Sequence, residues 1–133
     1  MNVKDLDGKI TYWHLHGNIN KDFHKQSTYH KSAKNLLTKI YPTMQILEEV
    51  PINIRKSEYL YLDFYIPLIK TCIEVHGEQH YKFVAHYHSN QLAFLKGKKR
   101  DIDKKEWCIT NNIDYVELPY YDQDKWEKLI IEH

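Results

Sequence analysis

Hydrophobic and polar positions alternate along the centre of the chain in a way that predicts two consecutive β-strands. From 60 to 66, apolar residues alternate with polar or aromatic residues that include Asp63, which is the period of a strand with one apolar face. In the second strand, Glu74 and His76 alternate with apolar residues and so point to the same side. A tight turn is expected at Pro67-Leu68, and pairing of the two strands would place Asp63 and Glu74 about 5 Å apart.

The two acids predict a site for a divalent metal ion. Carboxylates at that separation repel each other unless a cation lies between them, and oxygen ligands suit a hard cation. We therefore expect Asp63 and Glu74 to bind Mg²⁺, with Mn²⁺ as an alternative. Gly77 directly follows His76, and a glycine lets the backbone approach a ligand closely. The other interpretation is a solvated pair on a surface hairpin, because antiparallel sheets often expose one face.

The sequence before the strand pair predicts a helix and an edge strand. From 29 to 41, apolar residues recur at i, i+3, i+4 and i+7, which predicts a helix with Ser27 as its N-cap. Pro42 is expected to end this helix. A strand over 44–54 is interrupted by Pro51, which predicts a position at the edge of the sheet.

The second half of the chain predicts a crossover connection. Residues 81–90 show no steady period and are expected to form a loop that orders over a ligand. A helix from about 90 to 111 precedes a strand over 113–118 and an amphipathic C-terminal helix. Because a helix joins the last two strands, the predicted fold class is α/β, with a mixed central β-sheet flanked by helices. The long helix is expected to bury Leu92, Leu95, Ile102, Trp107 and Ile109.

Composition and length indicate one intracellular domain. The chain has 133 residues, 42% of them apolar, which suits one core rather than two. The formal net charge of +1 gives no global signal for nucleic acid. Cys72 and Cys108 have no zinc or disulfide spacing, so we expect reduced, buried thiols and a cytoplasmic protein. No apolar run reaches membrane length and no signal peptide opens the chain, so no membrane partner is expected.

A local basic segment lies within the predicted long helix. Between 96 and 105, cations outnumber acids six to two. Such a run is usually a solvated helix face, and the alternative is contact with the backbone phosphates of double-stranded DNA. Asp101 and Lys104 share a helix face that is expected to look toward the strand pair. The candidate phosphate contacts are Lys98, Lys99, Arg100 and Lys104.

Four short sequence motifs follow one another from the middle of the chain onward. They are Leu62-Asp-Phe-Tyr-Ile-Pro67, Ile73-Glu-Val-His-Gly-Glu-Gln-His-Tyr81, Arg100-Asp-x-x-Lys104-x-x-Trp107-Cys108 and Val116-x-Leu118-Pro119-Tyr120. The series resembles the PD-(D/E)xK nuclease superfamily, in the branch that contains the very-short-patch mismatch repair endonuclease and phage homing-type nucleases.

This resemblance implies a fold and a division of the chain. It implies a restriction-endonuclease-like fold in which residues 27–121 form the nuclease core. An N-terminal extension or hairpin would occupy 1–26, and a C-terminal helix would occupy 122–133. The whole chain, 1–133, would then be one nuclease domain.

The resemblance also implies roles for individual residues. Asp63 and Glu74 match the two acids that bind the metal ion. His76 matches the position usually held by a lysine, and it could activate or orient water. Gln79 and His80 match the end of the motif and would position water or the scissile phosphate.

The early helix departs from the family pattern. Many relatives carry a glutamate on this helix, whereas the matching position here is Lys34. Glu48 or Glu49 could supply that acid instead.

These residues together predict hydrolysis of phosphodiester bonds. A divalent metal ion polarises the phosphoryl oxygen and lowers the pKa of a bound water, and His76, with an unperturbed pKa of about 6.5, can accept the proton of that water. We therefore expect a Mg²⁺-dependent DNA endonuclease, either a nickase or a site-specific, homing-like enzyme. It would act as a monomer or homodimer in the cytoplasm, that of the host if a phage encodes it.

Three other functions fit parts of the sequence. The first is a junction resolvase or a transposon-end nuclease, which would act as a dimer. The second is a non-catalytic nucleic-acid-binding module on the same fold. The third is a protein-binding inhibitor or structural domain, in which exposed tyrosines would form the interface.

Overall fold

A computed structural model describes residues 1–15 and 27–133, and its centre is a mixed sheet of four strands. The first three strands pair antiparallel and the last two pair parallel, in the order β3-β4-β5-β6. This arrangement confirms the predicted mixed sheet, and it confirms that the strand with Pro51 lies at an edge. The strands are β3 (Leu47–Arg55), β4 (Glu58–Ile66), β5 (Thr71–His76) and β6 (Asp114–Pro119).

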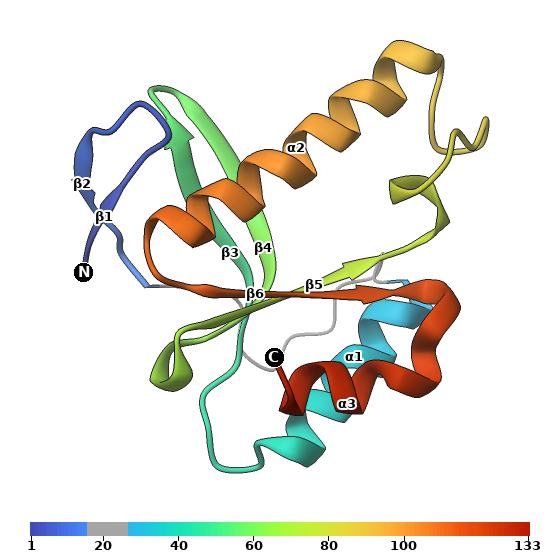
Figure 1. The fold of residues 1–133 in the computed structure, drawn as a ribbon, viewed down its shortest axis with the longest axis horizontal. Coiled ribbons are helices and arrows are strands. Elements are labelled where there is room, and N and C mark those ends of the chain that lie inside the picture. The colour runs from blue at the N-terminus through green and yellow to red at the C-terminus, as the bar shows by residue number, and fades with distance from the viewer. Residues whose placement is uncertain (16–26) are drawn as a thin grey trace.

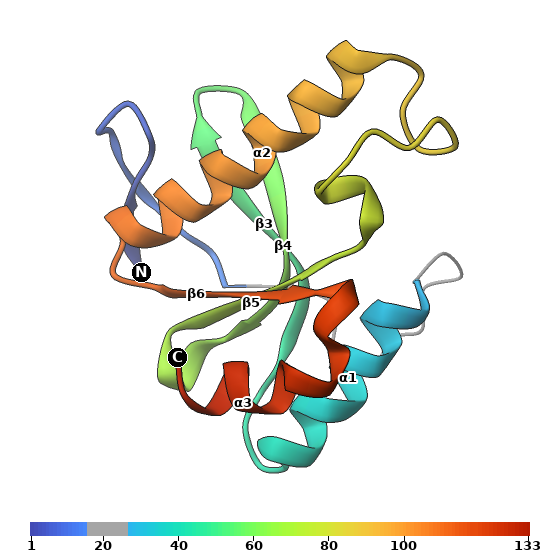
Figure 2. The same cartoon turned by 45° about the vertical axis from the view of Figure 1, so that its right-hand side comes forward.

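Helices cover both faces of this sheet. In Figures 1 and 2, α2 crosses one face, and α1 and α3 lie together on the opposite face. The helix α2 connects the parallel strands β5 and β6, as the predicted crossover requires. The flanking helices confirm the α/β class, and their bounds are α1 (Thr28–Ile40), α2 (Gln91–Thr110) and α3 (Trp126–Ile131).

Local signals account for the two longer helices. Ser27 caps α1, because its hydroxyl accepts a hydrogen bond from the backbone N–H of His30 at 3.0 Å. The side chain of Asn90 caps α2 in the same way, accepting from the N–H of Ala93 at 2.9 Å. The predicted start of the first helix at Ser27 is therefore confirmed.

Two hydrophobic cores lie on the two sides of the sheet. One core joins Trp107 and Cys108 of α2 to β3 and β4, and the other joins α1 and α3 to β4, β5 and β6. Every residue of β5 is buried, as expected for a strand that is covered on both faces. Polar side chains on β5 are therefore held away from water.

A small antiparallel hairpin, β1 (Asn2–Lys4) and β2 (Ile10–Tyr12), precedes the sheet. Its turn contains Gly8, whose φ of 84° suits glycine. This confirms a hairpin within the predicted segment 1–26, and residues 16–26 of that segment lie outside the described residues. Trp13 follows the hairpin and packs edge-on against Trp107 of α2, with ring centroids 5.0 Å apart.

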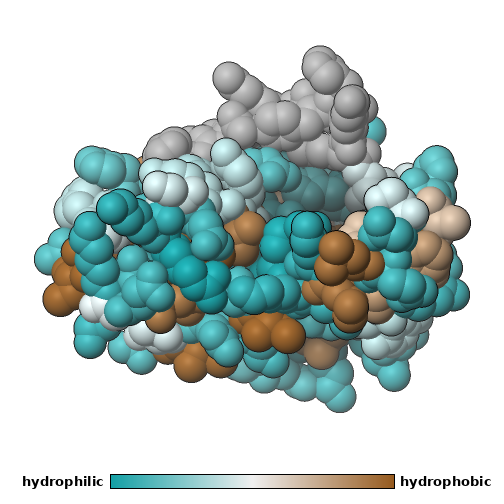
Figure 3. Space-filling view, turned by 90° about the horizontal axis from the view of Figure 1, so that it is seen from above, coloured by the Kyte–Doolittle hydropathy of each residue, from teal (hydrophilic) through white to brown (hydrophobic). Residues whose placement is uncertain are grey.

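The predicted burial of apolar side chains on α2 is wrong for four of five residues. Trp107 is fully buried, but Leu92, Leu95, Ile102 and Ile109 are exposed. The reason is that the inner face of α2 carries Asp101 and Lys104, so the helix turns its polar residues inward along part of its length. Figure 3, seen from the side on which α2 lies, shows separate apolar patches among hydrophilic residues.

The segment from 81 to 90 forms no helix or strand, as predicted. It joins a short 3-10 turn, η2 (Glu78–His80), to the start of α2. In the described parts of the chain, no helix is long and apolar enough to cross a membrane.

Candidate metal and catalytic site

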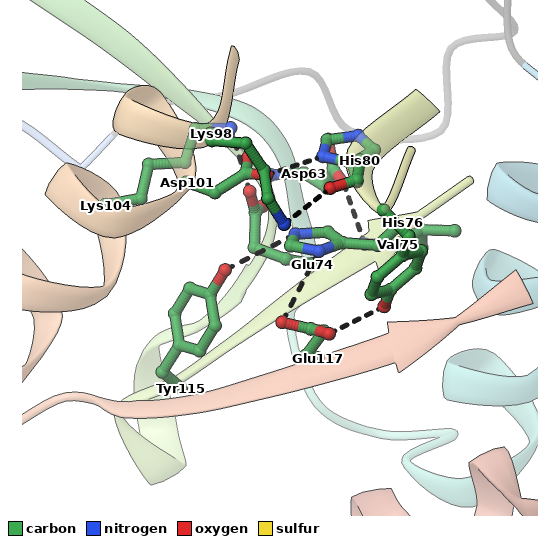
Figure 4. A network of polar contacts seen from close by, with 11 residues as sticks. Asp63, Glu74, Val75, His76, His80, Lys98, Asp101, Lys104, Tyr115 and Glu117 are labelled. Atoms are coloured by element: carbon green, nitrogen blue, oxygen red, sulfur yellow. Dashed lines mark hydrogen bonds and ion pairs between the residues drawn. The ribbon is translucent and has the colours of Figure 1, made fainter. Parts of the chain in front are cut away.

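Asp63 and Glu74 come together where the ladder between β4 and β5 ends. The last paired residues there are Phe64 and Ile73. Beyond them the side chains replace the ladder, as Figure 4 shows. The backbone N–H of Asp63 donates to Oε2 of Glu74 at 2.5 Å, and the N–H of Val75 donates to Oδ2 of Asp63 at 2.9 Å. The predicted proximity of the two acids is therefore confirmed, and each acid is fixed by the other strand.

Lys104 reaches this acid pair from α2. Its Nζ lies 2.8 Å from Oε1 of Glu74, and the two side chains are only 16% and 2% exposed. Burial alone would lower the pKa of Lys104, but the charges of Glu74 and Asp63 outweigh it and raise that pKa. The prediction that Lys104 faces the strand pair is confirmed. Its predicted role as a contact for DNA phosphates stays a prediction, and in the structure the amine forms a largely buried ion pair with Glu74.

Asp101 lies one turn before Lys104 on the same face of α2, and it contacts His80. The Nδ1 atom of His80 lies 2.9 Å from Oδ2 of Asp101. Burial alone would raise the pKa of Asp101, but the hydrogen bond and charge of His80 lower it. The two residues form a carboxylate–imidazole pair at the rim of the site.

His76 is buried beside this pair. Its ring stacks on that of His80, with centroids 4.2 Å apart and an interplanar angle of 10°. Burial, followed by the charge of His80, lowers the pKa of His76 to about 4. Its Nδ1 lies 3.4 Å from the Glu117 carboxylate, and the Tyr115 hydroxyl lies 3.4 Å from its Nε2. His76 is therefore neutral at pH 7, and both of its nitrogens have a polar neighbour.

Glu49 adds a third carboxylate from β3. The ladder to β4 pairs the residues on either side of Glu49 and omits Glu49 itself. Its φ is 50°, a left-handed conformation that is uncommon for a residue with a side chain. Ligand atoms of Glu49, Asp63 and His30 all lie within 4.8 Å of one another. Of the two acids that the sequence left open, Glu49 is the one that joins Asp63.

Glu48 points instead toward α1. Its carboxylate lies 3.2 Å from Nε2 of His30 and 3.2 Å from Nζ of Lys34. Lys34 of α1 therefore neutralises an acid from β3. Nothing in the local sequence distinguishes Glu48 from Glu49, and the register of β3 against β4 decides between them.

The positive charge near Glu49, Asp63 and Glu74 does not fully offset the cost of burying their three carboxylates. Burial raises the pKa of Asp63, and Lys104 opposes that rise only in part. Burial, followed by the charge of Asp63, raises the pKa of Glu74 to about 7. Burial also raises the pKa of Glu49, although His30 and Lys104 oppose it. An additional cation at this place would stabilise the ionised carboxylates, so a metal ion with oxygen ligands fits the residues present.

Gln79 lies at the edge of this arrangement. Its side chain folds against Gly77, where a Cβ would lie only 2.7 Å from its Oε1. Gln79 also lines a cleft of about 870 Å³ beside Tyr29 and Tyr120. Among the described residues it makes no hydrogen bond to Asp63 or Glu74, so only four of the five predicted catalytic residues are grouped.

The other predicted phosphate contacts do not form one surface. Lys98 donates from Nζ to the backbone oxygen of His80 at 2.8 Å, and this Nζ lies 5.8 Å from the centre of the Tyr81 ring. Lys99 and Arg100 are exposed on α2, and the Lys99 side chain is 67% exposed. Lys98 thus borders the site, whereas Lys99 and Arg100 line a separate cleft beside Tyr59 at the other end of β4.

The sequence patterns did not indicate that His30, Tyr115 and Glu117 belong to the candidate site. The alternation of β6 could have indicated the last two, because Tyr115 pairs with Cys72 and Glu117 with Glu74 in the parallel ladder. His30 had no such signal, because its helix was recognised by apolar residues alone.

Comparison with known proteins finds viral relatives over part of the chain. It is 42% identical over 65 residues to the uncharacterized protein 307L of Invertebrate iridescent virus 6, a match that covers 49% of this chain and 33% of that protein. It is 35% identical over 74 residues to the uncharacterized protein 094L of Frog virus 3 (isolate Goorha), covering 55% and 48%. The chain thus spans between a third and about a half of these relatives. No protein-family model and no solved structure matches the chain.

Proposed function

We propose that this chain is a metal-dependent DNA endonuclease with a restriction-endonuclease-like fold of the PD-(D/E)xK type. The observation that carries the proposal is the gathering of Glu49, Asp63 and Glu74 from three neighbouring strands at one place. All three have a raised pKa, so the site favours an additional cation. A divalent cation held there supplies polarisation of a phosphoryl oxygen and a lower pKa for a bound water.

Lys104 and the carboxylates have complementary roles in this proposal. Asp63 and Glu49 hold the cation. Lys104 favours the ionised form of Glu74 through their 2.8 Å contact, and its ammonium group adds positive charge where negative charge develops on the phosphate. This lysine comes from α2, although the resemblance implied that the lysine position falls on His76.

His80 is the candidate for proton transfer. Asp101 contacts Nδ1 of His80 at 2.9 Å, which orients the ring and leaves Nε2 to exchange a proton with water or the leaving oxygen. His76 supports this ring by stacking. Because the pKa of His76 is lowered to about 4, it adds no competing positive charge at neutral pH.

Cleavage of supercoiled plasmid tests this proposal. The wild-type chain, Glu74→Gln and the exposed control Glu106→Gln would be incubated with plasmid in Mg²⁺, in Mn²⁺ and in EDTA. We expect metal-dependent relaxed circles with the wild type and the control. Glu74→Gln should lose roughly 10- to 100-fold in rate, since that is the typical cost of changing a group that orients a metal ligand.

The products also separate the alternatives. Linear product together with a stable dimer would favour a junction resolvase or transposon-end nuclease, a candidate that the exposed apolar residues of α2 also favour. DNA binding in EDTA without cleavage under any condition would replace the endonuclease by a non-catalytic binding module.

A further inference from the structure

We propose that His30 and Glu49 join Asp63 as ligands of one cation, and that this mixed nitrogen and oxygen set selects a first-row transition ion such as Mn²⁺ over Mg²⁺. The inference deepens the proposed function by naming the kind of ion. It differs from the expectation that Asp63 and Glu74 alone form a magnesium site.

The three side chains come from three different elements and meet at one point. His30 lies on α1, Glu49 on β3 and Asp63 on β4, and one ligand atom of each lies within 4.8 Å of the other two. Two donors on opposite sides of one ion, with bonds of about 2.1 Å, are about 4.2 Å apart. Small side-chain movements would therefore bring all three onto one ion.

Glu74 is engaged elsewhere. Its Oε1 contacts Nζ of Lys104 and its Oε2 accepts from the backbone N–H of Asp63. These contacts direct Glu74 toward Lys104, whereas Glu49 and His30 approach Asp63 from the side of β3 and α1.

His30 has the surroundings of an oriented metal ligand. The ring is buried, stacks on Phe64 with centroids 4.5 Å apart and lies 3.2 Å from the Glu48 carboxylate. Glu48 is itself held by Lys34 at 3.2 Å. Histidines that bind metal ions are commonly oriented by a carboxylate on the other ring nitrogen. A buried histidine with this support is therefore prepared to bind an ion.

Glu49 lies opposite Asp63 in the register between β3 and β4, and its backbone is left-handed. Its left-handed backbone interrupts the ladder at this single residue, between the pairs Glu48–Phe64 and Val50–Leu62. Such conformations persist when the surrounding structure enforces them, and they concentrate at functional sites. Here the left-handed residue is the one opposite Asp63.

The donor set decides which ion fits. Mg²⁺ prefers oxygen ligands and retains several waters, whereas imidazole nitrogen favours transition metals. One imidazole with two carboxylates therefore suits Mn²⁺ and its first-row neighbours better than Mg²⁺.

A second group, His76, His80 and Asp101, also has ligand atoms within 4.8 Å of one another. Its members already contact one another and their neighbours, through the 2.9 Å contact between His80 and Asp101 and the contacts of both His76 nitrogens. This group supplies the matched comparison for a test.

Electron paramagnetic resonance with Mn²⁺ tests the proposal without DNA. Titration measures the affinity, and pulsed measurements report whether nitrogen is bound to the ion. We expect one Mn²⁺ per chain with a nitrogen coupling in the wild type. His30→Gln should remove the coupling and weaken binding at least tenfold, Glu49→Gln should weaken it to a similar extent, and His76→Gln should change neither. Mg²⁺ should compete at least tenfold more weakly than Mn²⁺.

Each other outcome overturns the proposal. A nitrogen coupling that survives in His30→Gln and disappears in His76→Gln would place the ion in the second group. Bound Mn²⁺ without nitrogen coupling, or no binding at millimolar Mn²⁺, would also refute it. Circular dichroism in EDTA checks that each variant is folded. If His30→Gln does not fold, Glu49→Gln and His76→Gln still assign the ion, because the first should weaken Mn²⁺ binding and the second should not.

The result is independent of the plasmid assay. Cleavage in Mg²⁺ without a nitrogen ligand would leave the endonuclease and remove this metal site. A nitrogen-bound Mn²⁺ without cleavage of any DNA would leave the metal site and remove the endonuclease.

Discussion

The inward and outward faces of α2 carry similar residue types, but the inward face is buried and the outward face is exposed to solvent. The inward face places Lys104 against Glu74 and Trp107 in the core, and both side chains are largely or fully buried. The outward face presents Lys105 and Ile102, which are both exposed, Ile102 by 56%. A lysine and a large apolar residue therefore occur on each side of the same helix.

This comparison shows that residue type did not decide which face of α2 is buried. The ion pair of Lys104 is favourable because the carboxylates of Glu74 and Asp63 are already removed from water on β5 and β4, and a nearby cation stabilises their charge. The exposed apolar side chains are tolerated, since much of any protein surface is apolar. The charged site, together with Trp107, thus oriented the helix.

Truncation of apolar residues on the two faces should give the largest difference. Trp107→Ala should lower the free energy of unfolding by about 3–5 kcal/mol, because it leaves a cavity in the core. Ile102→Ala should change it by less than about 0.5 kcal/mol, as an exposed position allows. Urea unfolding measures both. If Ile102→Ala lowers the free energy of unfolding as much as Trp107→Ala does, a second molecule covers the outer face. Gel filtration with light scattering would detect that second molecule.

Removal of the buried cation should have the next largest effect. Lys104→Met leaves Glu74 and Asp63 without their ammonium partner, and breaking a buried pair typically costs roughly 3–5 kcal/mol. We expect a value near the lower end, since Lys104 retains 16% exposure. Urea unfolding at pH 8 in EDTA measures this loss against a wild type in which Glu74 is mostly ionised, because its pKa is raised only to about 7.

The exposed neighbour Lys105 provides the control for this substitution. Lys105→Met should leave stability within about 0.5 kcal/mol of the wild type. The double variant Lys104→Met/Glu74→Gln should recover part of the loss, since it removes one of the unpaired charges. Equal stability of Lys104→Met and Lys105→Met would show that the ion pair does not stabilise the fold.

Neutralising the exposed cations near the middle of α2 should have the smallest effect on stability. Lys99→Gln and Arg100→Gln should unfold within about 0.5 kcal/mol of the wild type. If these residues contact DNA phosphates, each should reduce the slope of log affinity against log salt by about 1. Fluorescence anisotropy with duplex DNA across a salt series measures that slope, with Glu106→Gln as the control. An unchanged slope for both would exclude these two residues from DNA binding.

The amino-acid sequence by itself determined the features that depend on near neighbours. The strand pair around Asp63 and Glu74, the cap at Ser27, the edge position of the strand with Pro51 and the helical crossover were all predicted, because period, capping and proline geometry act locally. The predicted hairpin also brought Asp63 and Glu74 together. Its connection is longer than the turn predicted at Pro67-Leu68, because residues 67–70 join the strands and Ile66 pairs with Thr71.

Only the tertiary structure decided which distant side chains meet these two acids. A helical period does not specify how α2 rotates over the sheet, so Lys104 was assigned both to the strand pair and to a DNA surface. Nor does it indicate that His30 of α1 reaches β4, or that β3 turns Glu49 inward and Glu48 toward Lys34. Packing of three separate elements around buried charge settled those choices, because a carboxylate removed from water stabilises whichever arrangement brings positive charge to it.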